Sequence, residues 1–167
     1  AARKSPALRK FDAGDWSQIE PRFDRLEKDP AKNLRKWLAE FSDLAAALDE
    51  EMNRRYVAMT CHTEDPEKEK AHLFYQTEIL PKCKPRWQSL KKKLAAHPGV
   101  PKLPKDYRVF LQHTKNEIEI FRDANVPLEA REAELSQQYQ KICGEQIVTF
   151  DGKEQTLPQM AKVLEET

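Results

Sequence analysis

The fold is decided by the stretch from Leu34 to Met59, which reads LRKWLAEFSDLAAALDEEMNRRYVAM. Its apolar side chains recur at steps of three and four residues over about seven turns, the period of an α-helix with one apolar stripe. Charged residues such as Lys36, Glu40 and Arg54 occupy the opposite face. The sequence therefore predicts a long amphipathic helix whose stripe other helices must cover. The stripe consists of Leu34, Trp37, Leu38, Phe41, Leu44, Ala45, Leu48, Met52, Tyr56 and Met59.

A shorter helix is expected before this stretch, after a lead-in over residues 1–14. Asp15 opens a segment in which apolar residues again follow helical spacing. Proline is tolerated only near the first turn of a helix, so Pro21 predicts that the helix begins at Ser17 or later. Asp29-Pro30 then interrupts the chain. The apolar residues of this segment are Trp16, Ile19, Phe23 and Leu26.

The run Thr63-Glu64-Asp65-Pro66 is predicted to end the long helix and to cap the next one, because its side-chain oxygens can accept from unpaired backbone N–H groups. The next helix is expected from Pro66 to about Ala96. Pro81 and Pro85 lie inside it, and each removes a backbone hydrogen bond. We therefore expect a kink or a break there. Its predicted inner face is Ala71, Phe74, Thr77, Leu80, Trp87, Leu90 and Leu94.

Two further helices follow a proline-rich loop at residues 97–104. The first is predicted from Tyr107 to Phe121 and ends before Asn125-Val126-Pro127. The second is predicted over residues 129–144. The predicted inward residues are Tyr107, Phe110, Leu111, Thr114, Ile118 and Phe121 in the first, and Leu135, Tyr139 and Ile142 in the second.

The period changes to two at residues 146–150, where apolar and polar side chains alternate. Asp151-Gly152 is a strong turn signal, so these residues and 153–155 predict a β-hairpin. Thr156 is predicted to cap a last helix with Pro158 just inside it. No stop signal follows before Thr167, and we expect the chain to continue. The expected fold class is mainly α, an antiparallel bundle of long amphipathic helices with one small hairpin near the C-terminus.

The composition excludes several classes of function. Charged residues make up 34% of the 167 residues, but the net charge is only +1, so no global field attracts nucleic acid or an anionic membrane. No apolar run approaches the roughly 20 residues of a membrane-spanning helix, and no secretory signal is visible. Cys61, Cys83 and Cys143 form no paired framework and are each expected to be small buried residues. These features predict a cytoplasmic protein.

Catalytic and metal-binding patterns are missing from the sequence. A zinc site of the H-E-x-x-H type needs two histidines one helical turn apart, whereas no two of the four histidines are three to five residues apart. His113 and Glu117 form an i,i+4 pair, which supplies two ligands at most. No nucleophile elbow and no glycine-rich phosphate loop occur. We predict no catalytic, cofactor-binding or metal-binding residue, with His113 and Glu117 as the first suspects should zinc bind. The other histidines are His62, His72 and His97.

A basic cluster with an interleaved tryptophan lies in residues 82–93, and such a pattern can bind a phosphate backbone. Trp87 falls on the apolar stripe of its helix, however, so we expect it in the core and the cations on the wet face. The cluster comprises Lys82, Lys84, Arg86, Lys91, Lys92 and Lys93.

Several segments resemble the N-terminal region of the oligoendopeptidase F family, in matching order and spacing from Trp16 onward. None of them is a catalytic signature, but together they are fairly specific. They are residues 37–44 (WLAEFSDL), 54–66 (RRYVAMTCHTEDP), 116–122 (NEIEIFR), 135–139 (LSQQY) and 150–157 (FDGKEQTL).

The resemblance implies a thimet-oligopeptidase-like zinc metallopeptidase that cleaves short peptides in a cavity between helical halves. Its zinc ligands and its catalytic Glu would lie in a C-terminal catalytic domain, and no position of this sequence matches them. Residues 15–167 would be a non-catalytic N-terminal domain forming one wall of the cavity, inactive alone. The implied partners are the missing catalytic domain and the oligopeptide substrates of the full-length enzyme, with zinc as the parent's cofactor, and neither nucleic acid nor membrane.

Two other classes remain open at this point. A free-standing helical adaptor would present a groove or face to a partner helix. A nucleic-acid binder would use the cluster at residues 82–93 and would show salt-sensitive binding.

Overall fold

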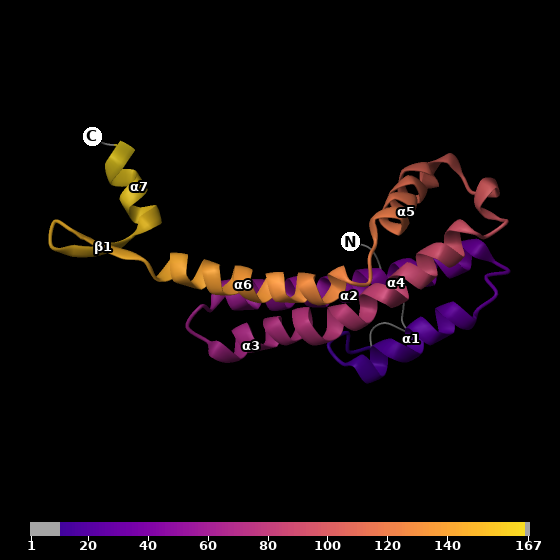
Figure 1. Ribbon diagram of the computed structural model, residues 1–167, viewed down its shortest axis with the longest axis horizontal. Helices are drawn as coiled ribbons and strands as arrows, with labels where there is room; N and C mark the ends of the chain where they lie inside the picture. The colour runs from indigo at the N-terminus through magenta and orange to yellow at the C-terminus, as the bar shows by residue number, and fades with distance from the viewer. Residues whose placement is uncertain (1–10, 166–167) are drawn as a thin grey trace.

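The chain folds as an antiparallel helical bundle followed by a small hairpin, which confirms the predicted fold class. The computed structural model describes residues 11–165. Figure 1 shows most of the helices along the long axis of the molecule, the helix at residues 108–120 at a steep angle to them, and the hairpin and last helix beyond the end of the bundle. The helices are α1 (Trp16–Lys28), α2 (Leu34–Cys61), α3 (Pro66–Phe74), α4 (Leu80–Ala95), α5 (Arg108–Ile120), α6 (Asn125–Glu145) and α7 (Leu157–Glu165). A π-helical segment, η2 (Tyr75–Ile79), joins α3 to α4, and 3₁₀ turns η3 (Val100–Lys102) and η4 (Lys105–Tyr107) precede α5.

Helix α2 is the centre of the bundle, as its apolar stripe predicts. Asn33 starts it by accepting a hydrogen bond from the Lys36 N–H at 3.1 Å. The indole of Trp37 donates to the Leu26 carbonyl at 2.9 Å and so ties α2 to the end of α1. Tyr56 is the exception, because its side chain is 45% exposed where α2 extends past α1. The buried members of the stripe are Leu34, Trp37, Leu38, Phe41, Leu44, Leu48 and Met59.

Helix α1 begins earlier than the sequence predicts. The Asp15 carboxylate accepts from the Ser17 N–H at 2.9 Å, which fixes the start at Trp16 and leaves Pro21 in the second turn. An interior proline costs about 3 kcal/mol. Burial of three large side chains, at roughly 1.5–3 kcal/mol each, outweighs that cost. They are Ile19, Phe23 and Leu26.

The predicted disruption near Pro81 takes the form of a change in helical hydrogen bonding, and the helix does not break. The Leu80 N–H donates to the carbonyl of Tyr75, five residues earlier, so the π-helical turn lies directly before the proline. The Tyr75 hydroxyl donates to the Leu48 carbonyl of α2 at 3.1 Å. The π-helical turn therefore presents Tyr75 and Ile79, both fully buried, to the core.

Helix α6 differs from its prediction in two respects. It starts at Asn125, and Pro127 sits in its first turn, where a backbone N–H has no helical partner anyway. Its expected inward residues point outward: Leu135, Tyr139 and Ile142 are 48%, 69% and 61% exposed. The physical reason is that α6 packs on η2 and α4 with its opposite face, so none of its residues is buried.

The hairpin forms where the alternating pattern predicts it, with β1 (Ile147–Phe150) antiparallel to β2 (Lys153–Thr156) and Phe150 paired with Lys153. Asp151 and Gly152 both have positive φ, at 50° and 72°, as a tight type I′ turn requires. The Thr156 N–H donates to Gln159 Oε1 at 2.8 Å, the reciprocal half of a capping box at the start of α7. The hairpin contacts α7 more than it contacts the bundle.

Phe74 was wrongly predicted on the inner face of its helix: its side chain is 48% exposed, and the next residue, Tyr75, is buried instead. Ala13 is buried and Phe11 packs against the core, while residues 1–10 of the expected lead-in lie outside the described residues. None of the described helices is long and apolar enough to cross a membrane.

Candidate functional site

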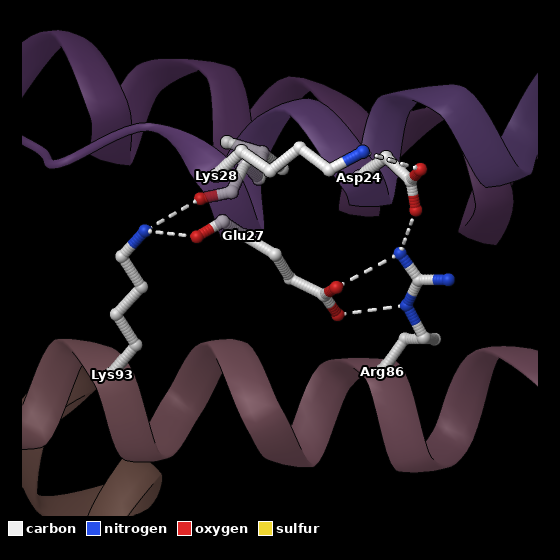
Figure 2. Close-up of polar contacts among 6 residues, drawn as sticks. Asp24, Glu27, Lys28, Arg86 and Lys93 are labelled. Carbon is white, nitrogen blue, oxygen red and sulfur yellow. Dashed lines mark hydrogen bonds and ion pairs between the residues drawn. The ribbon is translucent and has the colours of Figure 1, made fainter.

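Arg86 of the basic cluster joins α4 to α1 (Figure 2). Its Nε and Nη2 atoms donate to the two carboxylate oxygens of Glu27 at 2.7 and 3.0 Å, and Nη2 also reaches Asp24. Burial alone would lower the pKa of Arg86, but these hydrogen bonds outweigh it and raise the pKa. The hydrogen bond from Arg86, helped by Lys28, lowers the pKa of Asp24. The guanidinium of Arg86 therefore has a structural role, because it joins α4 to two carboxylates of α1.

Lys93, two turns further along α4, caps the C-terminus of α1 (Figure 2). Its ammonium donates to the carbonyls of Leu26 and Glu27 at 2.9 and 2.8 Å, and also to that of Asp29. The last carbonyls of a helix lack intrahelical donors and carry partial negative charge, so a cation there is favourable. Lys93 thus satisfies the end of α1 instead of facing solvent.

The other cations of the cluster are also mostly engaged. The Lys82 ammonium lies 5.9 Å from the ring centre of Trp16, Lys91 pairs with Glu117 at 3.1 Å, and Lys84 pairs with Glu129. Trp87 packs edge-on against the rings of Phe23 and Phe41, at centroid distances of 4.8 and 4.9 Å, which confirms its place beside the core. Five of the six basic residues therefore hold partners within the chain, which leaves little free charge for a phosphate backbone.

The four histidines lie apart from one another. His113 is exposed on α5, and the carboxylate of its neighbour Glu117 pairs with Lys91. His62 faces Glu64 at 3.5 Å, and His97 accepts from the Gly99 N–H at 3.0 Å. Within the described residues, no three His, Cys, Asp or Glu side chains lie close enough together to hold a metal ion.

His72 is a titratable residue that the sequence did not single out, because α3 is short and its apolar pattern is weak. It is 8% exposed on α3, and its ring lies 5.7 Å from that of Tyr56. The Nδ1 atom is buried and has no hydrogen-bond partner among residues 11–165 that the structure describes. Burial, and then the nearby Arg55 guanidinium, lower the pKa of His72 below 6.5. The imidazole is therefore held in its neutral form between α2 and α3.

The three cysteines do not share one environment, so the expectation that each is buried holds for one of them. Cys83 is 1% exposed, and burial raises the pKa of its thiol to about 12, which suppresses the reactive thiolate. Cys61, at the end of α2, is exposed, and Cys143 of α6 is half-buried. No disulfide joins them.

The described surface includes two grooves of notable size. One, of about 650 Å³, runs between α2 and α5 and is lined by Leu38, Phe41, Tyr107 and Phe110 among others. The other, of about 330 Å³, lies between the α2–α3 turn and the C-terminal half of α6. Its lining includes the charged or titratable residues His62, Glu64, Asp65, Glu69 and Lys141. Neither groove holds a nucleophile hydrogen-bonded to a base.

The segments that follow α5 carry many exposed apolar side chains. Large apolar side chains are exposed along α6 and then along the hairpin, whereas the buried core is built from residues before α6. Groups of exposed apolar side chains mark interaction sites. The exposed residues are Leu128, Leu135, Tyr139, Ile142, Ile147, Val148, Phe150 and Leu157.

The part of the chain that builds the buried core matches a known protein family. The family described as the Peptidase M3 N-terminal domain matches residues 10–121, which run from just before α1 to the end of α5. The chain belongs to this family. Searches of curated proteins and of solved structures found no match. The M3 N-terminal domain therefore coincides with the segment that builds the core, and α6, the hairpin and α7 lie outside the matched range.

Membership links the chain to M3 metallopeptidases, and the family as a whole is tied to zinc. The described residues of this M3 N-terminal domain do not fit a zinc site. The pair that the sequence put forward, His113 and Glu117, is exposed, and its carboxylate already pairs with Lys91. No step of peptide hydrolysis can be derived from this donor set.

Proposed function

We propose that this chain is the non-catalytic N-terminal domain of a zinc metallopeptidase of the oligoendopeptidase F type, and that it forms one wall of the cavity in which short peptides are hydrolysed. The observation that carries the proposal is the match of the M3 N-terminal domain to the whole core-forming segment. The resemblance of residues 37–44 and 150–157 to oligoendopeptidase F supports the finer assignment.

The packing of the bundle suits a wall. Core side chains on α1, α2 and α4 interlock through the rings of Phe23, Phe41 and Trp87. Arg86 and Lys93 join α1 to α4 through charged hydrogen bonds. A rigid helical surface of this kind can exclude folded proteins from a cavity and admit extended peptides, without supplying any reacting group.

In this proposal the peptidase domain of the parent enzyme supplies the zinc, which activates water and polarises the peptide carbonyl. The partners are that domain and the oligopeptides that enter the cavity. A cytoplasmic location, expected from three unpaired thiols, belongs to the same proposal.

The test is hydrolysis of a quenched fluorogenic peptide library, with metal content measured by elemental analysis. The chain alone, with zinc added, should show no turnover and no stoichiometric zinc, whereas the full-length parent should show both. Chelator-sensitive turnover by the chain alone would overturn the non-catalytic role. A parent without peptidase activity would overturn the link to the enzyme. The exposed apolar face of α6 also suits a free-standing adaptor, and a parent that binds a helical partner but cleaves no peptide would establish that role instead.

A further inference from the structure

Helix α6 packs on the bundle with its weakly apolar face. Ala130, Ala133 and Gln137 are half-buried and recur at helical spacing on one side of the helix. Helix α6 contacts η2 and α4, and two ion pairs also hold α6 on the bundle. Glu129 pairs with Lys84 near the start of α6, and Lys141 pairs with Glu69 of α3 at 3.2 Å near its end. Small and polar side chains therefore attach α6 to the bundle.

The opposite face of α6 carries its large apolar side chains. Leu128, Leu135, Tyr139 and Ile142 follow one another at steps of seven, four and three residues, which places all four on a single stripe. At 1.5 Å per residue the stripe is about 21 Å long. A stripe of this kind normally faces a core, but here every member is exposed. We name these four residues the α6 stripe.

The hairpin continues this surface. Val148 and Phe150 alternate to one face of β1, where Lys153 and Gln155 of β2 lie opposite them. Both apolar side chains are exposed, at 40% and 46%. A two-stranded hairpin is marginally stable alone and gains stability when its apolar face is covered.

We infer that the α6 stripe, with Val148 and Phe150, is the surface on which the peptidase domain of the parent M3 enzyme docks. The inference rests on the proposed function and adds the location of the contact to it. Two observations favour this occupant. The family match ends at residue 121, so the surface lies outside the M3 N-terminal domain that builds its own core. The apolar surface is also carried by the segments that directly follow that domain in the chain.

The extent of the stripe argues against a second copy as the occupant. The six side chains of the proposed surface offer on the order of 600 Å², whereas stable complexes of two free proteins bury about 800 Å² per partner. A domain in the same polypeptide needs far less contact, because the linkage raises its effective concentration to the millimolar range. The α6 stripe is therefore better suited to contact within one chain than to dimerisation.

Photo-crosslinking in the full-length parent enzyme tests the inference. A benzophenone amino acid is introduced at Tyr139 in one variant and at Glu20, an exposed position on α1, in the control. After irradiation, crosslinked peptides are identified by mass spectrometry. Tyr139 should crosslink to the peptidase domain within the same polypeptide, and Glu20 should not.

A second pair of variants tests the surface without the probe. Leu135→Asp with Ile142→Asp should lower peptidase activity at least tenfold, while Gln138→Asp, on the exposed flank of the same helix, should change it less than twofold. Crosslinks from Tyr139 to a second copy, or no crosslink at all, would overturn the inference. If the parent binds zinc and cleaves peptides in those cases, only the docking surface is wrong. If the parent does neither, the proposed function fails.

Discussion

Helices α2 and α6 are the two longest in the described chain and carry apolar residues at the same spacing, yet their apolar stripes lie in opposite environments. In α2 the stripe is buried by α1, by the consecutive helical segments α3, η2 and α4, and by α5. Ring contacts join Phe41 to Trp87 and to Phe110. In α6 the stripe faces solvent and the helix rests on alanines. Helical periodicity therefore identifies the apolar face of a helix but does not determine whether the same chain covers that face.

The largest difference between the two regions should appear in stability. Phe23→Ala removes a fully buried ring that packs on Trp87, and should lower the free energy of unfolding by about 3–5 kcal/mol. Leu135→Ala in the α6 stripe should change it by less than about 0.5 kcal/mol, since the side chain is already solvated in the isolated chain. Urea denaturation followed by circular dichroism measures both. Similar losses in the two variants would mean that α6 is packed as tightly as α1.

Removing the Arg86 guanidinium should have the next largest effect. Arg86→Ala leaves Glu27 and Asp24 without their partner and should cost about 1–2 kcal/mol, because charged hydrogen bonds are strong but this one is partly solvated. Arg54→Ala is the matched control, since Arg54 makes an exposed i,i+4 pair with Glu50 worth less than about 0.5 kcal/mol. Equal costs would show that Arg86 is an ordinary surface cation. Thermal melts of both variants at low and high salt measure the two losses of stability and their dependence on salt.

A smaller effect should depend on pH through His72. Its folded-state pKa lies below the ordinary value of 6.5, so the unfolded chain binds the proton more readily than the folded chain does. The stability that neutral His72 contributes is therefore fully present above pH 6.5 and is lost as the pH falls towards the lowered pKa. Denaturation midpoints across this range should decline in the wild type. His72→Phe should flatten the decline and His113→Gln, at an exposed site, should not; an unchanged profile in His72→Phe would contradict the assignment.

The smallest effect on the isolated chain is expected within the α6 stripe itself. Ile142→Asp should leave the free energy of unfolding within about 0.5 kcal/mol of the wild type, because it places a charge where solvent already is. If the exposed α6 stripe causes weak self-association of the wild type, the sedimentation coefficient of the Ile142→Asp variant should also depend less on protein concentration. A loss above about 2 kcal/mol would show that the chain buries this residue itself.

Much of the fold follows from local sequence patterns. The stripe of α2, the Asp65 cap of α3 and the Asp151-Gly152 turn each depend on residues near in sequence, and each was predictable. The starts of α1 and α6, which contain Pro21 and Pro127, were predicted too late in the sequence. Burial along α1 outweighs the cost of Pro21, and Pro127 is tolerated because it lies in the first turn of α6. Such outcomes depend on tertiary contacts and lie beyond local propensity.

The candidate site was less accessible to sequence reasoning. The position of Trp87 beside the core followed from helical period. The environment of His72 and the pairing of Arg86 with Glu27 required partners many residues away in sequence. The outward face of α6 could not be predicted either, because a helix with alanines on one side and large apolar residues on the other can pack by either face.

In our proposal, residues 11–121 complete their own core, whereas the peptidase domain would cover α6 and the hairpin. Hydrogen–deuterium exchange in the isolated chain and in the full-length parent tests it most directly. Amides of α2 should be equally protected in both proteins, and those of α6 and β1 should exchange rapidly in the isolated chain and be protected strongly in the parent. Equal protection of α6 in the two proteins would contradict the account.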